Sequence, residues 1–162
     1  MKIERFTLKD LILQALVAGI YVALTLVFSS ISYGDIQFRI AEVLIILVLF
    51  NPKFAIGILV GTLLANINST LGPIDWICGT LASAISIVLM LKLYKKSVAL
   101  ALLAPAAVNG VIVAWMLYVV LQLPILYSIA TVFFGEFVVV FIGGGLLYQS
   151  LSNNQGFRKL VE

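Results

Sequence analysis

The chain has 162 residues, of which 63% are apolar and 10% are charged, and its formal net charge is +3. A soluble domain of this length is about half apolar and about a quarter charged, and its interior is too small to bury such an excess. The composition therefore excludes an ordinary soluble protein, and the few basic residues form no stripe of the kind that binds nucleic acid.

The first apolar run, residues 11–31, follows a polar head that contains Lys2, Arg5 and Lys9. A secretory signal peptide would have an apolar core of about 7–15 residues and a cleavage site with small residues. This run is longer and has no such site, so we expect a retained first helix. Small residues in it allow another helix to approach closely, either a partner protein or this chain's own helices; they are Ala15, Ala18, Gly19 and Ala23.

Two shorter apolar runs follow, residues 40–50 and 54–65, and an Asn-Pro-Lys turn at residues 51–53 separates them. Each run is shorter than the roughly 20 residues that a full crossing needs. They are either two short crossings or a hairpin that turns back inside the membrane. The hairpin would place Lys53 near the bilayer centre at a cost of about 3 kcal/mol or more, so we expect two crossings.

Three longer apolar runs complete the pattern, and they favour an all-α membrane protein with a six-transmembrane-helix bundle. We expect one transmembrane domain, residues 1–162, with helices over about 7–32, 37–50, 53–68, 75–94, 98–121 and 125–150. With the N-terminus in the cytoplasm, nine basic residues fall inside and only Arg39 falls outside. Both termini are then cytoplasmic, and Arg39 is expected to have a specific role.

Polar side chains within the runs are few and should be satisfied by one another or by a ligand. The candidates are Gln37, Arg39, Glu42, Asn66, Asp75 and Trp76 at the expected outer face, Asn109 after Pro105, and Glu136 deeper in the last helix. Simpler interpretations exist: Arg39 and Glu42 can pair on one helix face. Asp75 can cap a helix, and Trp76 can be an interfacial aromatic residue. Glu136 has no basic residue before it in its helix and must pair elsewhere, be protonated or meet a ligand.

These groups suit a flat, nitrogen-rich ligand. A carboxylate accepts hydrogen bonds from adjacent N–H groups of a guanine-like edge, and an amide offers both a donor and an acceptor. Candidate stacking faces are Trp76, Trp115 and Tyr118. The sequence contains no histidine, no His/Cys cluster and no phosphate-binding Gly-x-x-x-x-Gly-Lys loop. We therefore expect no catalytic residues, no metal site, no cofactor and no ATPase activity in this chain.

Residues 34–42 resemble the Gly-x-x-Gln-x-Arg-x-x-Glu signature of the QueT family. Residues 64–66 and 71–75, with the Gly79 that follows, are similar to further segments of that family. QueT proteins are similar to the S components of energy-coupling factor (ECF) transporters. The resemblance implies a six-helix bundle in a prokaryotic cell membrane, and a queuosine precursor of the 7-deazaguanine type, or queuine, as the ligand.

The resemblance also implies partners, namely a transmembrane coupling subunit and two ATPase subunits that drive uptake. In such systems small residues of the first helix face the coupling subunit, and here these are Ala15, Ala18, Gly19 and Ala23. The ligand site would lie near the outer face, under the loops that join neighbouring helices. Two alternatives stay open: an S component for another micronutrient such as cobalamin, or a channel or facilitator that works alone.

Overall fold

The computed structural model describes residues 6–32, 38–69 and 71–161, and the elements in these ranges are all helical. Two of them depart from the α-helix: η1 is a 3₁₀-helix and η2 is a π-helix. The elements in chain order are α1 (Leu8–Val27), α2 (Ser29–Ser32), η1 (Ile40–Leu49), α3 (Phe54–Asn66), α4 (Pro73–Tyr94), α5 (Val98–Leu121), α6 (Ile125–Glu136), η2 (Phe137–Gly143), α7 (Gly144–Ser152) and α8 (Gln155–Val161).

Within the described ranges, four helical stretches are long and apolar enough to cross a membrane. They are α1, α4, α5 and the continuous stretch Ile125–Ser152, whereas η1 and α3 are shorter apolar helices. The prediction of an all-α membrane protein is therefore confirmed. The crossing of the bilayer by η1 and α3, and the cytoplasmic position of both termini, stay predictions.

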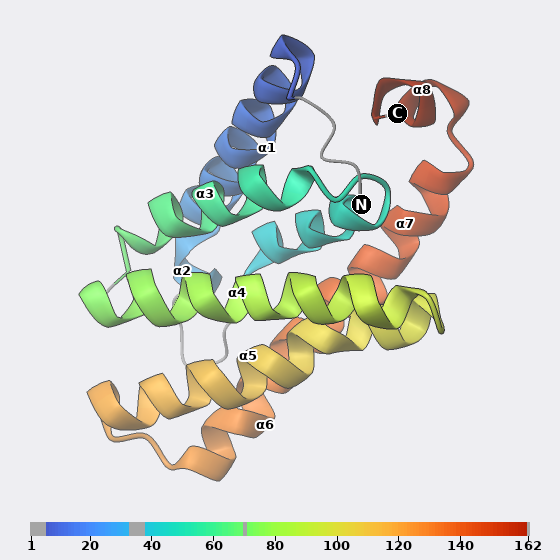
Figure 1. The fold of residues 1–162 in the computed structure, drawn as a ribbon. Coiled ribbons are helices and arrows are strands. Elements are labelled where there is room, and N and C mark those ends of the chain that lie inside the picture. Colours follow the sequence, from blue (N-terminus) through green and yellow to red (C-terminus); the bar gives the residue numbers. More distant parts are fainter. Residues whose placement is uncertain (1–5, 33–37, 70, 162) are drawn as a thin grey trace.

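The elements meet at two opposite ends of the bundle (Figure 1). The α3–α4 and α5–α6 connections lie at one end, and we call it the α3–α4 end. The η1–α3 turn, the α4–α5 connection and α8 lie at the other, and we call it the α8 end (Figure 1). Because α4 packs between α3 and α5, the residues that begin α4 lie close to those that end α3.

Helix α1 begins at a capping box, in which the Asp10 amide donates to Thr7 Oγ1 and the Thr7 amide donates to Asp10 Oδ2. It then packs on α3, where two glycines four residues apart leave no room for a side chain. A Cβ added at Gly57 would lie 2.6 Å from the carbonyl oxygen of Gln14, and one at Gly61 would lie 2.8 Å from Tyr21 Cβ.

The 3₁₀-helix η1 lies in the centre of the bundle, against α1, α3, α4, α7 and η2. Its residues Ile45, Ile46 and Val48 are completely buried. A 3₁₀-helix rises about 2.0 Å per residue, so these ten residues extend about 20 Å, against about 15 Å for an α-helix. The predicted helix over residues 37–50 is thus present over Ile40–Leu49 in a stretched form.

The last long apolar run contains three elements, whereas one helix over residues 125–150 was predicted. The π-helix begins at Phe137, directly after Glu136, and ends where a run of three glycines begins. A π-turn widens the helix and changes the direction of the side chains on either side of it. The chain then turns at Asn154, whose Oδ1 accepts from the Phe157 amide, and forms α8, which was not predicted.

Candidate ligand-binding site

Six of the predicted site residues have side chains that are at most 7% exposed to solvent in the bundle. They come from the start of η1, the end of α3, the start of α4, and the middle of α5 and the α6–η2 stretch: Arg39, Glu42, Asn66, Asp75, Asn109 and Glu136. We call these six residues the polar cluster. Charged groups are costly to bury, so their partners decide what the cluster can do.

Arg39 forms an ion pair with Asp75, with 3.7 Å between Arg39 Nη2 and Asp75 Oδ2. The arginine thus joins the start of η1 to the first turn of α4, across two elements rather than along one helix face. Helix α4 begins at Pro73 after Gly72, whose φ of +70° is a conformation that glycine adopts readily. Asp75 therefore sits inside the first turn with its side chain buried, and the simple capping interpretation of Asp75 is wrong.

Asn66 and Gly79 lie next to Asp75 of the ion pair. Asn66 Nδ2 donates to the backbone oxygen of Asp75 at 3.0 Å and links the end of α3 to α4. A Cβ added at Gly79 would collide with Asp75 Oδ1 and would lie 2.6 Å from Asn66 Nδ2. The absence of a side chain at position 79 therefore makes room for both of these polar groups.

Glu42 accepts two hydrogen bonds on the same oxygen. The Tyr21 hydroxyl donates to Oε1 at 2.7 Å, and Ser83 Oγ donates to it at 3.5 Å. The other oxygen, Oε2, is buried and has no hydrogen-bond partner among the described residues. Tyr21 and Ser83 were not among the predicted residues. Tyr21 could have been noticed, because it is the one tyrosine within the first apolar run.

Glu136 has a similar arrangement on the other side of the cluster. Asn109 Nδ2 donates to Glu136 Oε1 at 2.8 Å, and Oε2 has no partner in the part of the chain that the structure describes. The positive charge of Arg39 acts on Asp75, Glu42 and Glu136 together, so these groups form one electrostatic cluster. Among the described residues, three acidic side chains interact with this one guanidinium, and the excess of acceptors favours a ligand with several N–H donors or a positive charge.

Several buried polar atoms of the cluster and its surroundings form no hydrogen bond with the described residues. Over residues 6–32, 38–69 and 71–161, the buried atoms without a hydrogen-bond partner include Glu42 Oε2, Glu136 Oε2, both carboxylate oxygens of Asp75, Asn66 Oδ1 and Trp76 Nε1. Buried polar atoms are normally paired, so these atoms can each take a further partner such as a ligand or a water molecule. No group of three His, Cys, Asp or Glu residues in these ranges is arranged to hold a metal ion.

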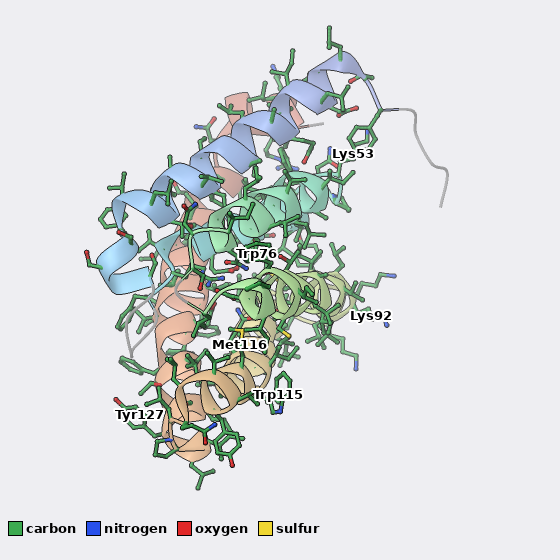
Figure 2. The ribbon with its side chains drawn as sticks, turned by 90° about the vertical axis from the view of Figure 1, so that its left-hand side faces the viewer. Lys53, Trp76, Lys92, Trp115, Met116 and Tyr127 are labelled. Atoms are coloured by element: carbon green, nitrogen blue, oxygen red, sulfur yellow. The ribbon has the colours of Figure 1, made fainter. Side chains whose placement is uncertain are left out.

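The remaining predicted ligand residues are placed less uniformly. Trp76 is partly buried at the start of α4. Trp115 and Tyr118 are 48% and 47% exposed on α5, and Figure 2 shows Trp115 at the outside of the bundle, so neither is a wall of the polar cluster. Gln37 lies outside the described residues.

The small residues of α1 divide between two faces. Ala15, Gly19 and Ala23 are exposed, and a Cβ added at Gly19 would meet no atom of the described residues within 4 Å. Ala18 is buried instead, because its Cα lies 3.1 Å from the Cβ position of Gly61 on α3. The exposed small face therefore consists of three residues, and Ala18 belongs to the internal α1–α3 contact.

A family model described as the QueT transporter matches residues 11–153 of the chain. The chain belongs to the QueT transporter family. A curated relative, the queuosine precursor transporter QueT of Lactococcus lactis subsp. cremoris, is 36% identical over 89 residues. The match covers 54% of this chain and 52% of the relative, so it spans about half the length of each. No solved structure matches the chain.

Membership of the QueT transporter family agrees with the long apolar helices of the chain. The residues matched by the family model include all six residues of the polar cluster, since these lie between positions 39 and 136.

Proposed function

We propose that this QueT-family chain is the substrate-binding S component of an ECF-type importer, and that the polar cluster binds a queuosine precursor or queuine. The observation that carries the proposal is the set of buried carboxylates near Arg39 with oxygens that accept no hydrogen bond from the described residues. The printed name of the Lactococcus relative supports the choice of ligand class.

A 7-deazaguanine fits the cluster for chemical reasons. Its guanine-like edge presents adjacent N–H donors, which one carboxylate can accept side by side. Its carbonyl oxygen can accept from Arg39 or from an amide of the cluster. A basic amine on the ligand would offset the excess negative charge of Glu42, Asp75 and Glu136.

The first experiment measures binding of queuine and its deazaguanine precursors to the purified protein by isothermal titration calorimetry. We expect sub-micromolar affinity, and Glu42→Gln and Glu136→Gln should each weaken binding by about tenfold or more, as loss of a hydrogen bond to a charged group does. Guanine and cobalamin serve as comparison ligands. Failure of the whole deazaguanine series to bind would refute the ligand assignment, and tight binding of cobalamin would replace it.

We further propose that the coupling subunit docks on the exposed small face of α1, formed by Ala15, Gly19 and Ala23. These residues are small and exposed on the outside of the bundle, which suits close packing of a second protein's helices. Replacing Gly19 by Leu should prevent assembly with the coupling and ATPase subunits while ligand binding by the isolated chain is retained. Co-purification of the four subunits measures the first property, and calorimetry measures the second.

Transport assays separate an importer from a facilitator. In liposomes, uptake of the ligand should require ATP and the coupling and ATPase subunits. Uptake by the chain alone, without those subunits, would contradict the S-component assignment and support a facilitator.

A further inference from the structure

A cavity of about 280 Å³ lies at the α8 end of the bundle, away from the polar cluster. Its polar lining comes from Tyr94 at the end of α4, Tyr148 and Ser152 on α7, and Arg158 on α8. Asp75 of the polar cluster lies in the first turn of α4 and Tyr94 is the last residue of the same helix, so about 28 Å separates them along the helix axis. The cavity is therefore a separate place on the molecule.

The polar atoms of this cavity can donate to an anion. The hydroxyls of Tyr94 and Tyr148 are 2.7 Å apart, and only one of the two protons is used in the bond between them. The hydroxyl that accepts keeps its own proton, which can be donated to a ligand. Arg158 lines the same cavity, and its positive charge interacts electrostatically with the Tyr94 hydroxyl. A guanidinium has donors only, and its planar fork matches the oxygens of a phosphate.

The remaining walls are apolar. The centroid of the Phe50 ring lies 5.0 Å from that of the Tyr148 ring and 5.2 Å from that of the Phe157 ring. The buried Val161 lines the same cavity. Four exposed lysines lie near the ends of α4 and α8, the helices that carry Tyr94 and Arg158, and we call them the basic rim: Lys92, Lys95, Lys96 and Lys159. Figure 2 shows the Lys92 side chain pointing away from the bundle. Such a group of cations attracts anions, including acidic lipid headgroups, to the rim.

We propose that this cavity binds a phosphate group attached to an apolar body. One phosphate oxygen accepts from the Arg158 fork and another accepts the unused tyrosine proton. The carbon part lies against Phe50 and Val161. Two sources carry this chemistry, the headgroup of an anionic phospholipid in the surrounding bilayer and a water-soluble phosphate ester.

The test uses the full-length protein in nanodiscs of phosphatidylcholine, with phosphatidylglycerol added stepwise and bound lipid counted by native mass spectrometry. A parallel titration uses glycerol phosphate in place of the lipid. We expect retention of one phosphatidylglycerol in preference to phosphatidylcholine. Arg158→Gln should lower that retention by about tenfold or more, as loss of a charge-assisted hydrogen bond does.

The matched control is Lys159→Gln, which removes the same charge from the next residue of α8 and should leave retention unchanged. Both side chains are exposed, but Arg158 lines the cavity and Lys159 does not. The double variant Tyr94→Phe/Tyr148→Phe is preferable to either single one, because each hydroxyl alone would keep a free proton. It should weaken retention by about fivefold, as loss of a neutral hydrogen bond does.

Equal losses in Arg158→Gln and Lys159→Gln would show attraction by the basic rim alone and would overturn the proposal. So would the absence of any preference for phosphatidylglycerol together with the absence of glycerol phosphate binding. Binding of glycerol phosphate that Arg158→Gln abolishes would support the cavity and assign it to the soluble source. Unchanged deazaguanine binding in Arg158→Gln would show that the variant is folded.

Discussion

At the scale of single residues, Tyr21 decides which oxygen of Glu42 is available to a ligand. Its hydroxyl donates to Oε1 and is itself completely buried, so Oε2 remains the open acceptor. A carboxylate whose orientation is fixed in this way loses little conformational freedom when a ligand arrives. Tyr21 is thus a positioning residue for the proposed site, although it lies on a helix whose other face is exposed.

Tyr21→Phe removes this hydrogen bond with almost no change in volume. We expect deazaguanine affinity to fall by about tenfold, since the bond is made to a charged group. Calorimetry with the purified variant measures the effect. Tyr127→Phe is the matched control, because Tyr127 is exposed on α6, and its affinity should equal that of the unaltered protein. Equal affinities for both variants would show that Tyr21 has no role in binding.

Gly79→Ala tests the space beside Asp75. The added methyl would meet Asp75 Oδ1 and Asn66 Nδ2, which are the ends of side chains and can move without disturbing the backbone. We therefore expect a folded protein with ligand binding weakened by about tenfold, the effect of displacing a charged hydrogen-bonding group. Gly145→Ala is the control, because its methyl would make only an ordinary contact with Leu102. A thermal unfolding curve alongside the binding curve separates misfolding from displacement.

The sequence predicted which polar residues would lie within the apolar runs, but not the contacts among them. Arg39 was identified by its place on the expected outer side, yet its partner is Asp75 and not the nearby Glu42. Pairings of this kind depend on how η1 and α4 pack, and hydropathy contains no information on packing. The same limit explains Ala18, whose small side chain indicated a close contact without showing with which helix.

At the scale of elements, the helices follow the hydropathy closely where the runs are long and less closely where they are short. Helices α4 and α5 begin or end within two residues of the predicted bounds, since each is a continuous apolar run with polar neighbours. The 3₁₀ form of η1 and the π form of η2 could not be predicted. Both are departures from α-helical hydrogen bonding that surrounding helices stabilise, and no residue pattern specifies them.

Gly61→Ala tests the contact between α1 and α3. The new Cβ would lie 2.8 Å from Tyr21 Cβ and 3.1 Å from Ala18 Cα, atoms that cannot move unless the helices separate. We expect the free energy of unfolding to fall by about 1–3 kcal/mol, as in other overpacked cores. Thermal unfolding in detergent measures the change. Gly19→Ala, where the methyl meets nothing, should keep the stability of the unaltered protein.

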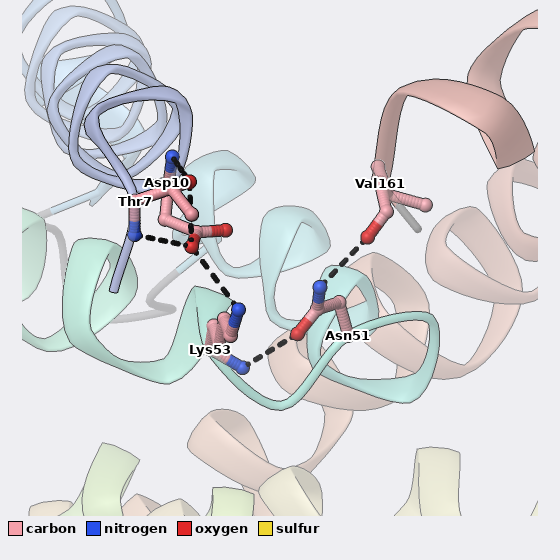
Figure 3. A network of polar contacts seen from close by, with 5 residues as sticks. All are labelled: Thr7, Asp10, Asn51, Lys53 and Val161. Atoms are coloured by element: carbon pink, nitrogen blue, oxygen red, sulfur yellow. Dashed lines mark hydrogen bonds and ion pairs between the residues drawn. The ribbon is translucent and has the colours of Figure 1, made fainter. Parts of the chain in front are cut away.

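At the scale of the whole molecule, the η1–α3 turn joins the two ends of the chain (Figure 3). Lys53 Nζ lies 3.1 Å from Asp10 Oδ2 on α1, and its amide donates to Asn51 Oδ1. Asn51 Nδ2 in turn donates to the backbone oxygen of Val161 on α8 at 2.7 Å. Polar contacts therefore join the start of α1, the η1–α3 turn and the end of α8, which are distant in sequence, at the α8 end of the bundle. This end is opposite the polar cluster.

This arrangement leads to a prediction about topology. In a Cys78→Ser background, single cysteines at Pro52, Lys96 and Gln155, all exposed at the α8 end, should react with an impermeant thiol reagent from the cytoplasmic side. Cysteines at Asn68 and Gln122 should react from the outside. Intact cells and inverted vesicles distinguish the sides. A cysteine at position 52 that is protected from both sides would indicate a re-entrant hairpin.

The buried polar cluster has a consequence for the synthesis of the protein in the cell. Segments enter the membrane in chain order, but Arg39 obtains its ion-pair partner only when α4 is made, and Glu42 at first has only Tyr21 of α1. Charged side chains within membrane-spanning segments are costly while they have no partner. The segment η1 is therefore not expected to enter the lipid on its own. We expect the insertion machinery to retain α1, η1 and α3 until α4 has been synthesised, and all four elements then to enter the lipid together. A nascent chain arrested before Asp75 should accordingly remain cross-linkable to that machinery, whereas one arrested after the end of α4 should be released.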